Sequence, residues 1–140
     1  MKLRSPDVQF HEDIRLLVWR PRGVLNESAI ERIVSLIGDL EAKSDSPFNR
    51  FTDVSAVETL DLNFKYVFHI ALFRRLSYAG HSPVKSAILV PSIAHAHYSK
   101  MHELLTRHSS IDVRIFEERD PAAKWLGVPV EFLSFSSIGS

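Results

Sequence analysis

The chain has 140 residues, no cysteine, and 17 basic and 17 acidic side chains. This length suits one domain with its own core, and the lack of cysteine excludes disulfides, thiolate metal sites and cysteine nucleophiles. Zero formal net charge gives no electrostatic bias toward nucleic acid, so no nucleic-acid partner is expected. Because no apolar run approaches ~20 residues and no signal peptide is recognisable, we expect a cytoplasmic protein without an integral membrane segment.

The N-terminal part of the chain predicts a hairpin. Two short strand candidates, Val8 to His11 and Leu16 to Arg20, are separated by Glu12 to Arg15, and this spacing suits a hairpin turn. Pro21 and Gly23 follow the second candidate, and both residue types end strands. These residues therefore predict an antiparallel pair at one edge of a sheet.

Residues Asn26 to Ala42 have the pattern of an amphipathic helix. Asn26 or Ser28 can cap its start, and Ser28 with Glu31 has the spacing of a capping box. The apolar positions recur at intervals of three and four residues; they are Ile30, Ile33, Val34, Ile37 and Leu40. Because these positions form one stripe, the helix is expected to cover a sheet.

The middle of the chain combines a buried strand, a polar segment and a long apolar helix. The strand is predicted from Phe51 to Val54, and the helix from about Leu62 to Ala79. Between them we expect a loop, because Asp53, Ser55 and Asp61 give this segment a polar character.

The second half of the chain continues the alternation of strands and helices. Strands are predicted at Val84 to Val90 and at Asp112 to Glu117, with a helix from Ile93 to His108 between them. A short last helix is expected with Asp120 as its cap, and a loose tail is expected over residues 128–140.

The predicted order of elements is β-β-α-β-α-β-α-β-α within one domain, residues 1–140. Alternating strands and helices indicate an α/β fold with a mostly parallel sheet and covering helices. The N-terminal hairpin adds an antiparallel edge to that sheet.

Two stretches of the chain carry a family resemblance. Asp53 to Asp61 (Asp-Val-Ser-Ala-Val-Glu-Thr-Leu-Asp) resembles the STAS superfamily of sulfate-transporter and anti-sigma-factor-antagonist domains, where a strand ends in Asp-aliphatic-Ser-x-Val. Val113 to Phe116, followed by Ala122 to Leu126, looks like the end of the SpoIIAA-like branch of small bacterial proteins. The resemblance implies a STAS-like, SpoIIAA-like domain with a regulatory role.

The chain departs from the family pattern at the start of the helix after Asp61. Leu62-Asn63-Phe64 stands where the family has Ser-Ser-Gly, and anti-sigma-factor antagonists are phosphorylated on the second of those serines. Asn63 has no hydroxyl group, so the phosphoserine switch that the family implies is not expected here. Asp61 matches the family and can favour the N-terminus of this helix.

Two apolar faces are predicted on the helix after Asp61. Phe64, Val67, Phe68, Ala71 and Leu72 form the face that is expected to pack on the sheet. A second face contains Tyr66, Ile70 and Phe73. A neighbouring helix covers this second face, or it is a contact patch for another molecule. A third possible cover is the C-terminal tail, with Phe132, Leu133 and Phe135.

No metal or cofactor site is predicted. Four histidines lie on the third predicted helix, and we expect them to be solvated or to cap; they are His95, His97, His102 and His108. His95 and His102 are ~10 Å apart along a helix, which is too far to share an ion. The sequence has no Gly-x-Ser-x-Gly elbow and no glycine-rich phosphate loop.

The sequence therefore favours a non-catalytic binding or regulatory domain. Its partner would be another protein, a second copy in a homodimer, or an apolar small molecule. The residues expected at the contact are Asp61, Leu62, Asn63, Tyr66, Ile70 and Phe73. The alternative is a small enzyme with a polar site near Asp53, Ser55 and Asp61.

Overall fold

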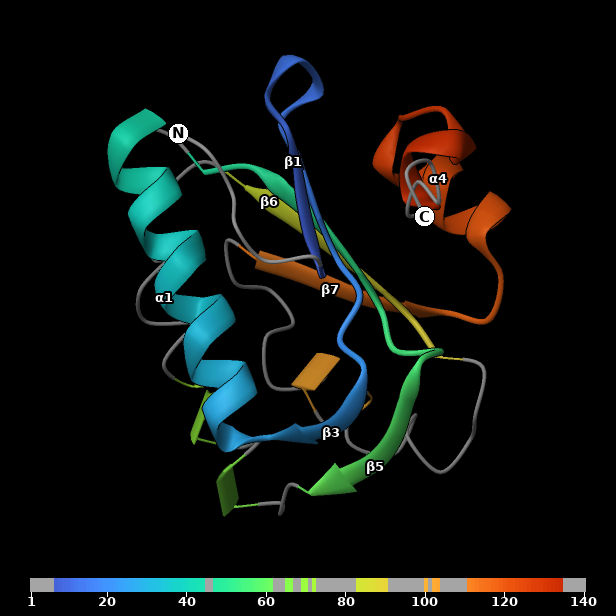
Figure 1. Ribbon diagram of the computed structural model, residues 1–140. Coiled ribbons are helices and arrows are strands. Elements are labelled where there is room, and N and C mark those ends of the chain that lie inside the picture. Colours follow the sequence, from blue (N-terminus) through green and yellow to red (C-terminus); the bar gives the residue numbers. More distant parts are fainter. Residues whose placement is uncertain are drawn as a thin grey trace.

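The computed structural model describes residues 7–44, 47–61, 65–66, 69–70, 72, 83–90, 100, 102–103 and 111–134. Its main sheet has five strands in the order β1-β2-β4-β6-β7. Their bounds are Val8–His11, Leu16–Trp19, Asn49–Asp53, Val84–Leu89 and Ile111–Phe116. The long helix α1, Glu27–Ser44, covers one face, and the short helix α4, Arg119–Leu126, covers the other (Figure 1).

The pairing of the strands confirms the predicted sheet. β1 and β2 are antiparallel around the 3-10 helix η1, Glu12–Ile14, and β2, β4, β6 and β7 are parallel to one another. Phe51 of β4 is fully buried, opposite Val18 on one side and Ala87 on the other. The apolar β4 and β6 thus lie inside the sheet, and the hairpin supplies one edge.

A second sheet, which the sequence did not predict, has two parallel strands. β3, Gly23–Asn26, pairs with β5, Val57–Asp61, so the expected polar loop is wrong for residues 57–61. The pair has one buried side, because Leu25 and Val57 pack in a hydrophobic cluster, although other residues of the two strands are polar. Gly23 has φ of +70°, a conformation that glycine adopts without strain, and it begins a strand instead of ending one.

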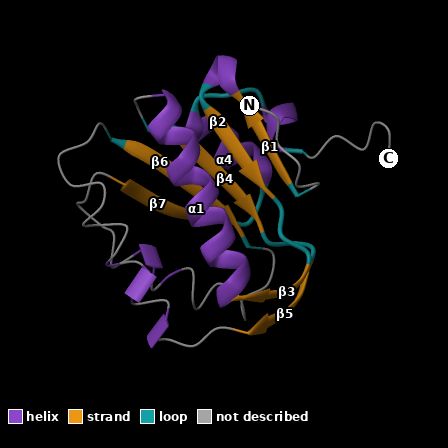
Figure 2. Ribbon diagram, turned by 60° about the vertical axis from the view of Figure 1, so that its left-hand side comes forward, coloured by secondary structure: helices purple, strands orange, loops and turns teal. Residues whose placement is uncertain are grey.

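The small sheet continues the central strands of the large one. β2 leads into β3 through residues 20–22, and β4 leads into β5 through residues 54–56; both pairs are parallel. At the break, the Gly23 amide donates a hydrogen bond to the Ala56 carbonyl at 3.2 Å. Figure 2 shows β3 and β5 side by side below the ends of β2 and β4.

Helix α1 follows the predicted pattern closely. The Ala29 amide donates to Oδ1 of Asn26 at 3.0 Å, so Asn26 is the cap, and not Ser28. From the predicted stripe, Ile33, Ile37 and Leu40 are buried in a cluster with side chains of β1, β2 and the segment before β4. This confirms that α1 covers the sheet with its apolar stripe.

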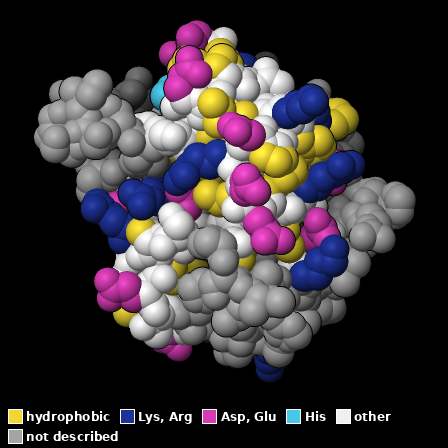
Figure 3. Space-filling view, turned by 90° about the vertical axis from the view of Figure 1, so that its right-hand side faces the viewer, with side chains coloured by type: hydrophobic (Ala, Val, Ile, Leu, Met, Phe, Trp, Pro, Cys, Tyr) yellow, Lys and Arg dark blue, Asp and Glu magenta, His cyan; other side chains and the backbone are white. Residues whose placement is uncertain are grey.

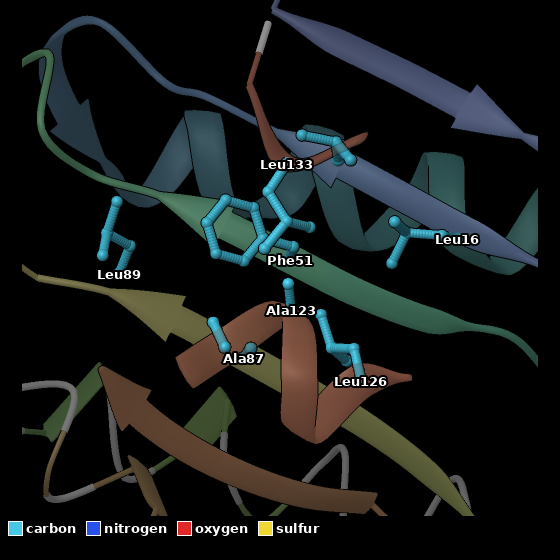
Figure 4. Close-up of a cluster of buried hydrophobic side chains, with 9 residues drawn as sticks. Leu16, Phe51, Ala87, Leu89, Ala123, Leu126 and Leu133 are labelled. Atoms are coloured by element: carbon cyan, nitrogen blue, oxygen red, sulfur yellow. The ribbon is translucent and has the colours of Figure 1, made fainter. Parts of the chain in front are cut away.

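The opposite face of the sheet packs against α4 and the 3-10 helix η2, Val130–Leu133 (Figure 4). Helix α4 begins at Arg119 with Glu118 at the cap position, two residues earlier than predicted, so Asp120 lies within the helix and is not its cap. The small side chains Ala122 and Ala123 let it lie close to β6. Within the predicted tail, Leu133 is fully buried, and residues 135–140 lie outside the described part.

The two helices predicted between β5 and β7 fall largely outside the described residues. Residues 65–66, 69–70 and 72 are helical, as are 100 and 102–103. In the described part of the chain, no helix has the length and apolar character needed to cross a bilayer.

Candidate functional site

A buried carboxylate lies between two arginines at the carboxyl ends of the parallel strands. Asp53 is the last residue of β4, Arg20 directly follows β2, and Arg119 follows β7 as the first residue of α4. We call Arg20, Asp53, Ser55 and Arg119 the Asp53 cluster. In open α/β sheets this edge is the usual position of a ligand site.

Both oxygens of the Asp53 carboxylate are occupied within the protein. Oδ1 accepts a hydrogen bond from the Ser55 amide at 2.9 Å, and Oδ2 accepts one from Nη2 of Arg119 at 2.7 Å. Nε of Arg20 lies 3.7 Å from the same Oδ2. The carboxylate is 1% exposed, while each arginine side chain is 38% exposed. The cluster therefore joins a buried anion to two cations that solvent can reach.

The sheet accounts for this arrangement. Because β2, β4, β6 and β7 are parallel, their carboxyl ends meet at one edge, where the Val54 amide bonds to Leu89 and the Val90 amide to Phe116. Arg119 reaches from the end of β7 past β6 to Asp53. The two residues are 66 positions apart in the sequence, so only the order of the strands brings them together.

The residues of the alternative enzyme site do not converge. Asp53 and Ser55 are adjacent, but Asp61 is an exposed residue at the far end of β5, where it pairs with Asn26. At ~3.3 Å per residue, β5 alone separates Asp61 from Val57 by about 13 Å. Neither oxygen of Asp53 is left without a partner to act as a base, because the Ser55 amide and the two arginines hold it.

Part of the predicted contact face lies beside α1. The hydroxyl of Tyr66 donates to the backbone carbonyl of Glu27 at 3.3 Å, and Tyr66 and Ile70 are both half-buried. Burial raises the pKa of Tyr66 above its ordinary value of 10.0, and the negative charges of Glu31 and Glu27 raise it further. Leu62, Asn63 and Phe73 lie outside the described residues, so their expected role stays a prediction.

The other face of the same helix differs from the prediction. Leu72 was expected to pack on the sheet, but its side chain is 45% exposed. Val24 of β3 is 52% exposed, and Val130 of η2 is 38% exposed. Figure 1 shows β3, β5 and the described pieces of the helix after β5 at the same end of the molecule, near the start of α1.

The shape and charge of the described surface add two observations. A hollow of about 620 Å³ beside α1 is lined by Ser28, Glu31, Arg32, Ser35, Leu36 and Asp39. On the face drawn in Figure 3, basic and acidic side chains are interspersed, with hydrophobic side chains between them. The described side chains on that face form no extended patch of one charge.

Of the four histidines on the third predicted helix, the structure describes His102 alone. His102 is buried and has an interaction partner, so the prediction that it is solvated is wrong. His95, His97 and His108 lie outside the described residues. Among the described residues, no group of three or more histidine, aspartate or glutamate side chains could hold a metal ion.

Comparisons with known proteins support the fold. No protein-family model matches the sequence, and no curated protein matches it. A structural match is an uncharacterised protein of the DUF3478 family with a SpoIIAA-like fold from Shewanella loihica PV-4, with a TM-score of 0.56 and 16% sequence identity. The match covers 85% of this chain and 90% of that chain. The chain therefore has an α/β, SpoIIAA-like fold, which confirms the resemblance at the level of fold.

Sequence reasoning identified Asp53 and Ser55 but missed the two arginines. A signal was present, because Arg20 is the last residue of one predicted strand and Arg119 lies two residues beyond another. In a parallel sheet, residues that follow strands share one edge with Asp53. Applying this rule to basic residues as well as acidic ones would have predicted the whole cluster.

Proposed function

We propose that the protein is a non-catalytic regulatory domain of the cytoplasm that acts by binding another protein molecule. The proposed contact surface, which we call the β3–β5 end, consists of β3, β5 and the exposed face of the helix after β5, with Asp61 and Leu72. The observation that carries the proposal is the exposure of Val24 and Leu72, two large apolar side chains of this end. Apolar side chains that gather on a surface with a polar rim are typical of protein contacts.

The enzyme alternative has less support. A general base needs a carboxylate that can accept a proton, and Asp53 is buried with both oxygens in contact with donors. Asp61 is too far along β5 to assist Ser55. Protein contact is therefore the form of binding that we favour.

The first test asks whether the contact is made with a second copy of the chain. The full chain should be sized by light scattering over a range of concentrations, together with the variants Val24→Asp and Leu72→Asp. A charge placed in an apolar contact has no partner there, so a dimer should become a folded monomer in both variants. Val130→Asp is the matched control, because it alters an exposed valine on the other side of the sheet.

A wild-type chain that is monomeric at every concentration would exclude the homodimer and leave a different protein as the partner. Loss of the dimer in Val130→Asp to the same extent would contradict the choice of surface. Substrate turnover that depends on Asp53 or Ser55 would contradict the non-catalytic proposal and restore the enzyme alternative.

A further inference from the structure

We infer that Arg20 and Arg119 of the Asp53 cluster form a binding site for a phosphate-type oxyanion, either free phosphate or the phosphate group of a small monoester. The two guanidinium groups meet at the carboxyl edge of the parallel sheet, where α/β folds commonly bind ligands. This inference is independent of the contact proposed at the β3–β5 end, because it concerns different side chains and a different ligand.

The charge of the cluster favours an anion. Two arginines share the single carboxylate of Asp53, which leaves one positive charge in excess. The Nε atoms of Arg20 and Arg119 are buried and have no hydrogen-bond partner. A guanidinium group has five N–H donors. Within the described residues, the two arginines together donate one hydrogen bond, from Nη2 of Arg119 to Asp53. The buried Nε atoms cannot reach a ligand from solvent, so the donors that the pair retains for an oxyanion are Nη1 and Nη2 of Arg20 and Nη1 of Arg119.

The buried carboxylate also fixes the arginines in advance. Asp53 ends a central strand and is itself held by the Ser55 amide, so the point at which both guanidinium groups attach is rigid. Two long side chains that are already ordered lose less conformational entropy when a ligand arrives. The Nε atoms are buried, yet each arginine side chain is 38% exposed. A ligand can therefore reach side-chain atoms other than Nε.

The acidic neighbours of Arg119 do not cancel the excess charge by direct contact. Glu117, Glu118 and Asp120 flank it in the sequence, yet within the described residues Asp53 is the only carboxylate in an ion pair with Arg119. Glu118 occupies the cap position of α4 but makes no side-chain capping bond. The guanidinium groups are therefore oriented by Asp53.

Phosphate suits this arrangement better than a single carboxylate. A tetrahedral oxyanion offers several oxygens, so it can accept from both guanidinium groups at once, and arginine forks match its geometry. The exposed Ser55 lies two residues beyond Asp53, close enough in sequence to add a hydroxyl at the rim. Free phosphate and a monoester present the same group, and a titration can distinguish them.

The test is calorimetric titration of the full chain with inorganic phosphate, at constant ionic strength in a chloride background. Arg20→Gln and Arg119→Gln remove one charge each while keeping a long polar side chain. Each should weaken binding by about tenfold or more, because each loses at least one charge-assisted hydrogen bond. Arg114→Gln is the matched control, since Arg114 is also an exposed arginine with one aspartate partner, Asp112. This control should bind phosphate as the wild type does.

Further titrations identify the class of ligand. Glycerol phosphate that binds as tightly as phosphate would show a site open to monoesters, and much weaker binding would show a site for free phosphate. Acetate that binds as tightly would contradict the preference for a tetrahedral anion. Absence of saturable binding by the wild type, or equal weakening in Arg114→Gln, would overturn the inference. Circular dichroism confirms that each variant is folded, and Arg20→Gln suffices if Arg119→Gln is not.

Discussion

Arg50 shows how a single buried charge constrains this fold. Its side chain is almost fully buried at the start of β4, where Nη2 donates to Oε2 of Glu41 at 2.7 Å. Its guanidinium carbon lies 5.7 Å from the centre of the Phe48 ring, which also packs against Phe10. This ion pair joins the end of α1 to β4, because Glu41 lies in the last turns of the helix.

Glu41→Leu should destabilise the protein by about 3 kcal/mol, because it leaves the Arg50 cation buried without its carboxylate. Adding Arg50→Met should recover much of this loss, since apolar side chains of similar size replace the pair. Unfolding in urea measures both values. Asp112→Asn is the control, because it breaks the exposed pair with Arg114 and should change stability by less than about 1 kcal/mol. A double variant less stable than Glu41→Leu would contradict this account.

Tyr66 should make the stability of the protein sensitive to alkaline pH. Its pKa in the folded chain lies above 10.0, so the unfolded chain loses the phenol proton first as the pH rises. The contribution of Tyr66 is therefore complete below pH 10.0 and is lost as the pH rises through the higher folded value. Ionisation also removes the proton that Tyr66 donates to Glu27.

Thermal melting of the wild type and of Tyr66→Phe over alkaline pH tests this expectation. The wild type should lose stability more steeply than the variant above pH 10.0. Absorbance of the ionised phenol should also show one late-titrating tyrosine that the variant lacks. Identical profiles of the two proteins would mean that Tyr66 is not shielded.

At the level of elements, η2 stabilises the core from its position after α4. Leu133 packs against side chains of β2, β4, β6 and α4, and it is fully buried (Figure 4). The rings of Phe132 and His11 also meet at an interplanar angle of 80°, with ring centres 4.9 Å apart. Residues 128–134 therefore belong to the folded domain.

Leu133→Ala should lower the free energy of unfolding by about 2–5 kcal/mol, the usual cost of a cavity at a buried leucine. Val130→Ala, in the same 3-10 helix but exposed, should change it by no more than about 0.5 kcal/mol. Urea unfolding of both variants makes the comparison. Equal and small effects would show that η2 contributes little to the core.

The sequence predicted the elements that have a regular apolar pattern. The stripe of α1 and the apolar runs around Phe51 and Ala87 determine a parallel sheet with a covering helix. β5 was missed because Glu58, Thr59 and Asp61 are exposed, so that only its pairing with β3 identifies it as a strand. For the site, the sequence pointed to Asp53, but its contact with Arg119 depends on the order of strands, which no local pattern contains.

For the whole molecule, the fold places two layers of covering elements on one sheet and extends that sheet at one end. α1 packs on the side of Leu17, and α4 with η2 packs on the side of Leu16 and Val18. Successive apolar side chains of β2 thus point alternately toward α1 and toward α4 with η2. The similarity to the SpoIIAA-like protein from Shewanella loihica PV-4 extends over 85% of the chain, so it includes this overall plan.

The large and the small sheet are connected by two short segments. β2–β3 and β4–β5 bend together at residues 20–22 and 54–56, and Arg20 and Ser55 belong to those two connections. An anion held by Arg20 and Arg119 would tie one connection to α4 and so restrict the angle of the β3–β5 end. By thermodynamic linkage, the anion and a protein bound at that end would then change each other's affinity by the same factor. The SpoIIAA-like fold would thereby have a means of regulation that needs no phosphorylated serine.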